Sequence, residues 1–329
     1  MKKSLLLFAL PLVALAACNK NNLDEVTNQN KTASFTAVVN LEDGTKTTLD
    51  GFTMSWTGDE TFYVNSLPTT YPTPGDGNTS YAISDLSATP FTNNLSGATA
   101  AFTSNSFAPG SFEDGVQYVV GSKRMSVSVV RANSDPGTTA VQQYYIQQKI
   151  DHNQTYNPSN SLGLANNVIP LYGYIRKTGG AGLEPSAVRM YTFGTIIKLT
   201  LTNNLGANKT IDHITVTSSV VGNAKGIAGT YFRYVNASLV QTNQLLSYYQ
   251  EQNTITLNCG DVVLPNTESK VFSFVLAGDM PKSFVGTLTF NVYEDGNDTP
   301  ISTFSITPSS VLASGKIYRK AYTMEVPMP

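Results

Sequence analysis

Chemically reactive side chains are scarce in this chain of 329 residues. It holds two cysteines, two histidines and one tryptophan, and only 13% of its residues are charged. Two cysteines exclude a disulfide framework of several bridges. A net charge of −2 without a basic stripe argues against a nucleic-acid partner. After residue 17 no apolar run is long enough to cross a membrane as a helix.

No catalytic constellation is evident either. His152 and His213 both lack the nearby partners that a zinc site uses, although Asp212 directly precedes His213. The chain contains no nucleophile elbow, phosphate loop or dinucleotide fingerprint. A pair of hydrolytic carboxylates would leave no local signature. The sequence therefore predicts a protein that is not an enzyme and that holds no metal and no cofactor.

The first residues have the pattern of an export signal. A basic start at Met1–Lys3 is followed by an apolar run, Leu5–Ala17, and small residues precede Cys18. This arrangement resembles the bacterial lipobox, which implies cleavage before Cys18 and lipidation of that residue. The alternative is an ordinary signal peptide with a chance cysteine. We expect residues 1–17 to be a lipoprotein signal peptide and residues 18–32, which are polar and without periodicity, to be a flexible tether.

Alternating apolar and polar residues predict strands along most of the remaining chain. Phe35, Ala37, Val39 and Leu41 alternate with more polar neighbours. Further strands are predicted within residues 61–64, 116–120, 126–130, 144–146, 197–201, 214–216, 272–276, 288–292 and 316–326. Residues 241–250 are the one stretch that suits a helical turn. Many short strands separated by turns predict an all-β protein of antiparallel β-sandwiches.

Glycine and proline mark the expected domain boundary. The segment Gly179–Pro185 contains three glycines and one proline, a composition typical of linkers. We therefore predict an N-terminal β-sandwich at residues 33–184 and a C-terminal one at residues 185–329. If Cys18 carries lipid, Cys259 has no disulfide partner, and we expect its side chain to be a small buried hydrophobe.

Several motifs resemble the fimbrillin family of Bacteroidetes lipoproteins, the subunits of type V pili. The sharpest runs from Thr45–Gly51 through the turn at Trp56–Asp59 into the apolar strand Phe62–Val64. Cys18–Asn21 and Gly315–Tyr318 fit the start and the closing strand of that family. The resemblance implies two antiparallel β-sandwich domains of transthyretin-like topology and a lipid anchor in the outer membrane. It also implies a role in adhesion, with other fimbrial subunits and host or bacterial surface ligands as partners.

Members of this family assemble by strand exchange, and the resemblance implies which residues of this chain would take part. A trypsin-like protease removes the first strand, and a strand donated by another subunit fills the groove. The displaced strand would hold Phe35, Ala37, Val39 and Leu41, and the cut would fall at Lys46, where the family usually has arginine. An ordinary solvated turn residue is the alternative for Lys46.

The donated strand is less clearly marked. Tyr318, Tyr322, Met324 and Val326 share one face of the last predicted strand, and only Pro327–Pro329 follow it. Since proline cannot supply ladder donors, either this strand is itself donated or the subunit donates nothing. The second case suits an accessory or tip-like subunit better than a stalk subunit.

A different class of function stays open at this point. A surface lipoprotein that binds glycans without polymerising would stack sugars on exposed aromatic rings. Trp56 and the pair Tyr248–Tyr249 are the residues that such a protein would use.

Overall fold

The structure of the chain is a computed structural model. It describes residues 33–43, 52–53, 60–67, 80–81, 89–93, 100–107, 112–122, 125–131, 142–159, 162–165, 168–176, 188–192, 194–220, 226–236, 241–278 and 286–326. These residues form 21 strands and no α-helix, so the all-β prediction is confirmed. Within these ranges no helix is long and apolar enough to cross a membrane.

The largest sheet has 11 strands and runs the length of the molecule. Its main path is β11-β7-β3-β5-β6-β1-β21-β13-β18, and β2 and β12 also pair with β1. Its members are β1 (Ala33–Asp43), β2 (Phe52–Thr53), β3 (Thr61–Leu67), β5 (Thr89–Thr92), β6 (Ala100–Ser104), β7 (Gln117–Gly121), β11 (Tyr172–Arg176), β12 (Val188–Met190), β13 (Gly194–Asn204), β18 (Ser269–Ala277) and β21 (Lys316–Glu325).

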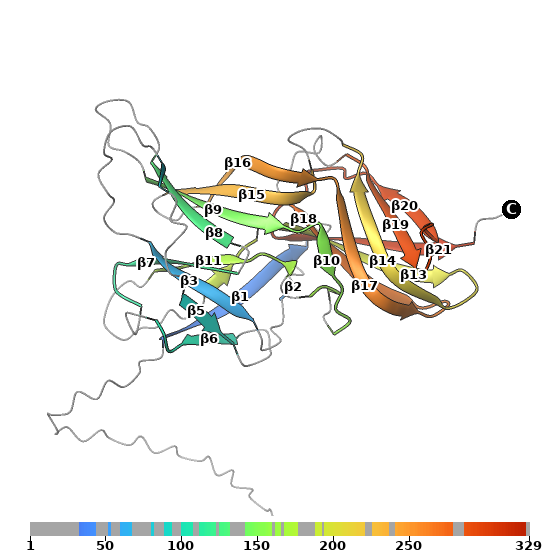
Figure 1. Cartoon of the computed structure of the whole chain (residues 1–329), viewed down its shortest axis with the longest axis horizontal. Helices are drawn as coiled ribbons and strands as arrows, with labels where there is room; N and C mark the ends of the chain where they lie inside the picture. The colour runs from blue at the N-terminus through green and yellow to red at the C-terminus, as the bar shows by residue number, and fades with distance from the viewer. Residues whose placement is uncertain are drawn as a thin grey trace, which may run out of the picture.

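Two smaller sheets of five strands each lie against this long one (Figure 1). The first has the order β16-β15-β9-β8-β4 and the second β10-β17-β14-β19-β20. Their strands are β4 (Ser80–Tyr81), β8 (Met125–Arg131), β9 (Gln142–Ile150), β15 (Ala228–Asn236), β16 (Gln241–Gln252), β10 (Asn153–Thr155), β14 (Lys209–Ser218), β17 (Thr254–Leu264), β19 (Leu288–Glu294) and β20 (Ser302–Ile306).

One small sheet thus lies against each end of the long sheet, which gives two sandwich-like pairs of layers. In Figure 1 the β8, β9, β15 and β16 ribbons lie over the β1–β7 end, and the β14, β17, β19 and β20 ribbons lie beside β13 and β21. In the second layer pair, Phe274 of β18 meets Phe290 of β19 with ring centroids 5.6 Å apart. Phe304 of β20 stacks on Tyr322 of β21 at 3.8 Å. These ring contacts join the two sheets through a common core.

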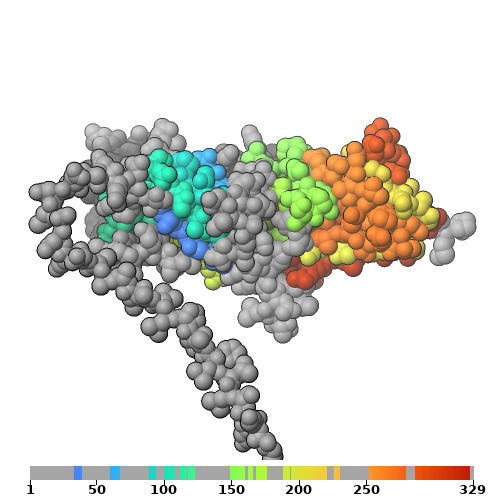
Figure 2. Space-filling model, turned by 90° about the horizontal axis from the view of Figure 1, so that it is seen from below, coloured from blue at the N-terminus to red at the C-terminus, as the bar shows by residue number. Residues whose placement is uncertain are grey.

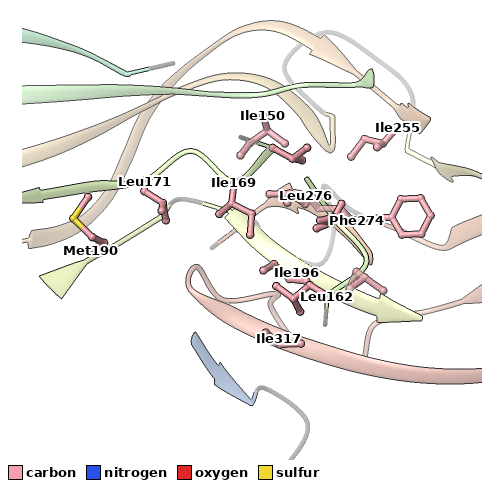
Figure 3. Close-up of a cluster of buried hydrophobic side chains, with 14 of the residues drawn as sticks. Ile150, Leu162, Ile169, Leu171, Met190, Ile196, Ile255, Phe274, Leu276 and Ile317 are labelled. Atoms are coloured by element: carbon pink, nitrogen blue, oxygen red, sulfur yellow. The ribbon is translucent and has the colours of Figure 1, made fainter. Parts of the chain in front are cut away.

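Strand pairing crosses the predicted boundary at residues 184 and 185 in all three sheets. β15 pairs with β9, β10 pairs with β17, and β1 pairs with both β12 and β21. These pairings join the two predicted parts of the chain, and the division into domains 33–184 and 185–329 stays a prediction. Buried side chains from both sides of that boundary meet in the middle of the molecule. Figure 3 shows this cluster, with Ile150, Leu162 and Ile169 beside Ile196, Leu276 and Ile317.

Every segment expected to be a strand from its alternation coincides with a strand, with Val116 and Val326 lying one residue outside β7 and β21. The expectation of a helical turn at residues 241–250 is wrong, because these residues belong to β16. β16 is paired antiparallel with β15 from Ala228↔Gln252 to Val235↔Gln241, with three register shifts on the way. An isolated helical turn is marginal in water, whereas pairing with β15 gives β16 hydrogen-bond partners along one of its edges.

Candidate functional site

The first strand, β1, is an internal strand of the long sheet. Residues 33–37 pair antiparallel with β6, and residues 37–39 pair parallel with β12. Ala37 takes part in both ladders, opposite Ala100 on one edge and Val188 on the other. Further along, Leu41 pairs with Phe52 of β2, and Asp43 pairs with Ile317 of β21. A single strand therefore joins strands from both halves of the sequence.

The core-facing side of β1 is buried at the three positions whose side chains are described. Ala33, Phe35 and Ala37 are 0%, 2% and 0% exposed, while Ser34 and Thr36 on the other face are half-buried. This is the period-two pattern of a strand with one face on the core. In the space-filling view only a small area of β1, in blue, is visible beside β6, in cyan (Figure 2).

Phe35 lies inside a cluster of aromatic rings. Its centroid is 5.4 Å from those of Phe91 and Phe102, and the Phe102 ring is nearly parallel to it at 13°. Phe62 and Phe112 approach edge-on at 6.5 and 6.4 Å. These rings come from β3, β5, β6 and the segment before β7, so Phe35 links β1 to all of them. Stacked and edge-to-face pairs add stabilisation beyond the buried area itself.

The structure describes only some of the residues that were predicted to take part in lipidation and strand exchange. Cys18 and Lys46 lie outside the described residues. Val39 and Leu41 have described backbones, with Val39 paired to Met190 and Leu41 to Phe52, but their side chains are outside the described set. Phe35 and Ala37 are thus the two displaced-strand residues whose side chains are placed, and both lie in the core.

Three of the four candidate donor residues lie on β21, Val326 directly follows it, and the four differ in burial. Met324 is fully buried, and Tyr322 is half-buried against Phe304. The Tyr318 hydroxyl donates to the carbonyl of Val311 at 3.2 Å, and it accepts from the N–H of Ala313 at 3.0 Å. Val326 is 59% exposed. β21 is also paired with β13 without interruption from Ile317 to Glu325, so it is an integral part of the long sheet.

The histidines do not assemble a reactive site in the described part of the chain. His213 Nδ1 lies 2.6 Å from Asp212 Oδ2, and the ring stacks on Tyr293 at 4.3 Å. His152 Nε2 contacts the Asn153 amide at 3.2 Å on the surface. Among the described residues no group of three or more His, Cys, Asp and Glu side chains has the geometry to hold a metal ion.

Cys259 is buried, as expected from the sequence. Its thiol is free and only 6% of the residue is exposed. Burial raises the pKa of the Cys259 thiol to about 12, and the nearby Asp212 carboxylate adds to the shift. A thiol in this state remains protonated and behaves as a small hydrophobe.

The aromatic residues of the glycan-binding alternative have no described side-chain environment. Trp56 lies outside the described residues, and only the backbones of Tyr248 and Tyr249 are placed, in β16.

The sequence did not point to three of the four partners of β1, because neither the two-residue β2 nor β6 and β12 were expected as strands. β6 has the burial pattern of a strand with one buried face, but its Ala100, Phe102 and Ser104 face contains a single large apolar residue. β12 spans only Val188–Met190, which is too short for its alternation to be read. The alternation in β6 is a signal that could have been found, whereas β12 depends on its place beside β1.

Comparison with known proteins finds solved structures that are similar to this chain, but no match to its sequence. No family model matches it, and no curated protein matches it in sequence. It is similar to the crystal structure of a candidate cell adhesion protein from Bacteroides ovatus (14% identity, 90% of this chain and 93% of that one, TM-score 0.46). A candidate cell adhesion protein from Bacteroides uniformis is similar at 10% identity, covering 91% and 94% of the chains with a TM-score of 0.41. A fimbrial protein from Bacteroides ovatus is similar at 8% identity, covering 89% and 50%, with a TM-score of 0.36.

Proposed function

We propose that this chain is a structural or accessory subunit of a type V fimbria with a role in adhesion. In this proposal it is made as a precursor that is lipidated at Cys18 and anchored on the surface of the outer membrane. Cleavage at Lys46 then frees β1, and a strand from another fimbrial subunit takes its place. The role is structural and not enzymatic. The motifs shared with fimbrillins at Thr45–Gly51 and Trp56–Asp59 support it.

One structural observation carries the proposal: β1 pairs with β6 over residues 33–37 and with β12 over residues 37–39, and its side chains at Ala33, Phe35 and Ala37 are buried. Its removal would leave backbone donors and acceptors unpaired on both β6 and β12, and it would empty the space around Phe35. A donated strand restores both by pairing along the same edges and by filling the same space. Each large apolar side chain buried this way contributes about 1.5–3 kcal/mol.

The position of the cut agrees with this arrangement. β1 ends at Asp43 and β2 begins at Phe52, so Lys46 lies in the connection between two strands that pair with each other. Cutting there separates β1 from the rest of the chain without breaking any other described strand. The backbone that leaves with it carries all the β1 pairings described above.

An accepting role fits this chain better than a donating one. β21 is paired along β13, and it carries the buried side chains of Ile317 and Met324. Donating it would break that ladder and expose both residues. We therefore propose that the subunit accepts a strand in place of β1 and keeps β21 in its own sheet, as an accessory subunit would.

Strand replacement can be tested on a chain carrying the recognition site of a sequence-specific protease at Lys46. The cut chain is denatured and refolded with a molar excess of fluorescent peptide of sequence 33–43. We expect the peptide to co-elute with the folded chain, and the uncut chain, treated in the same way, to exclude it. A cut chain that refolds and excludes the peptide would contradict strand replacement.

A further inference from the structure

The core face of β1 has a shape that any replacement strand has to reproduce. From Ala33 through Phe35 to Ala37 it alternates small, large and small, and all three side chains are buried. The large position is deep, because Phe35 is surrounded by aromatic rings on β3, β5 and β6 and before β7. A strand without a ring there would leave that cluster with a cavity.

The two small positions are shallow. Ala37 lies opposite Ala100 of β6 and Val188 of β12, so its neighbours close in from both edges. Ala33 lies opposite Ser104, which is itself 6% exposed. Directly opposite residues share a face with their Cβ atoms about 5 Å apart. A longer side chain at either position would overpack these buried contacts.

We propose that the strand replacing β1 carries a small–x–aromatic–x–small pattern, which the closing strand β21 of a second copy lacks. This inference rests on the proposed function and names the partner that the emptied groove would select. The aromatic residue takes the place of Phe35, and alanine, glycine or serine takes the places of Ala33 and Ala37.

A second copy of this chain does not offer that pattern through β21. Its aromatic residues are Tyr318 and Tyr322, and Lys320 lies two residues from each of them. Placing either tyrosine at the Phe35 position puts Lys320 at the Ala33 or the Ala37 position, whichever way the strand runs. Both positions are 0% exposed, and an unpaired ammonium group is very costly to bury. The geometry therefore excludes β21 of a sister molecule as the incoming strand.

A panel of peptides tests this selectivity on the cut and refolded chain. The reference peptide has the sequence 33–43, and its dissociation constant is measured by fluorescence anisotropy. We expect Phe35→Ala to weaken binding about a hundredfold or more. Ala37→Leu should weaken it about tenfold or more. The control Thr36→Leu places the same leucine side chain on the other face and should change binding by less than about threefold. A peptide of sequence 316–326 should not bind.

The outcomes separate this inference from the proposed function. If no peptide binds, including the reference, strand replacement itself is overturned and the inference falls with it. If the reference binds and Phe35→Ala and Ala37→Leu bind equally well, the pattern is overturned while strand replacement stands. If the 316–326 peptide binds as tightly as the reference, β21 of a sister molecule is an acceptable donor and its exclusion is overturned.

Discussion

Phe35 connects β1 to the aromatic core of the N-terminal end of the molecule. We predict that Phe35→Ala lowers the free energy of unfolding of the uncut chain by about 3–5 kcal/mol, because the cavity would be lined by rings that cannot all collapse into it. Urea denaturation measures the change. Thr36→Ala is the matched control on the opposite face and should cost far less. A loss below about 1 kcal/mol for Phe35→Ala would contradict the packing described here.

Cys259 makes a prediction about alkaline pH. The folded chain holds its thiol proton up to about pH 12, whereas the unfolded chain releases it near 9.0. Between these values the unfolded state binds fewer protons than the folded state. The stability that the buried, protonated Cys259 thiol contributes is therefore complete below pH 9.0 and is lost as the pH rises toward 12. The loss has a limiting slope of about 1.4 kcal/mol per pH unit.

The test compares the native chain with Cys259→Ala by urea denaturation at several pH values. We expect the difference in unfolding free energy between the two to shrink steadily above pH 9.0. Because Cys259→Ala keeps all the other titrating groups, it is the control for their effect on the native chain. A difference that stays constant over this window would mean that the thiol is accessible to water in the folded chain.

At the scale of elements, one side chain pairs with the edge of β18 at Val275. Gln154 of β10 is 1% exposed, and its amide accepts from the N–H of Val275 at 2.9 Å and donates to the Val275 carbonyl at 2.7 Å. The same amide nitrogen donates to the carbonyl of Asp151 at 3.0 Å. The side chain thus pairs with β18 as another strand would, and it joins β10 of one sheet to the edge of another.

We predict that Gln154→Ala destabilises the chain by about 1–3 kcal/mol for each buried backbone group of Val275 that loses its partner. Thermal or urea denaturation measures the change. The exposed neighbour Asn153 gives the control, since Asn153→Ala should alter stability by no more than about 0.5 kcal/mol. Equal effects of the two substitutions would show that the Gln154 bonds do not hold β10 in place.

The strands that could be predicted from the sequence are those with large residues in strict alternation. β1, β13 and β19 have that pattern because one face of each packs on the core. β16 and β12 could not be predicted, since β16 has a mixed polar sequence and β12 is only three residues long. Both are strands because a neighbour supplies the hydrogen-bond partners, which is information that lies elsewhere in the chain.

The candidate site could likewise be predicted from the sequence only in part. The alternation at Phe35 and Ala37 predicted a buried face correctly. That Ala37 is paired on both edges depends on β6 and β12, and that the end of β1 reaches β21 depends on the long sheet being continuous. Local pattern sets which face of a strand is buried, while the partners of that strand follow from the assembled sheet.

At the scale of the whole molecule, β1 ties the two ends together. It begins beside β6 at one end and finishes beside Ile317 of β21, next to the buried cluster in the middle (Figure 3). Replacing it therefore affects the main sheet in both halves of the sequence. A donated strand of similar length would restore this connection, so the mature subunit would be held together by its neighbour.

The most direct test is the N-terminal residue of this chain recovered from fimbriae on the cell surface, determined by Edman degradation or mass spectrometry. The proposal predicts a chain that starts at Thr47, with β1 absent and another polypeptide in its place. A Lys46→Gln variant should remain a lipidated precursor that starts at Cys18. An assembled, surface-exposed chain that starts at Cys18 and still carries β1 would contradict strand replacement.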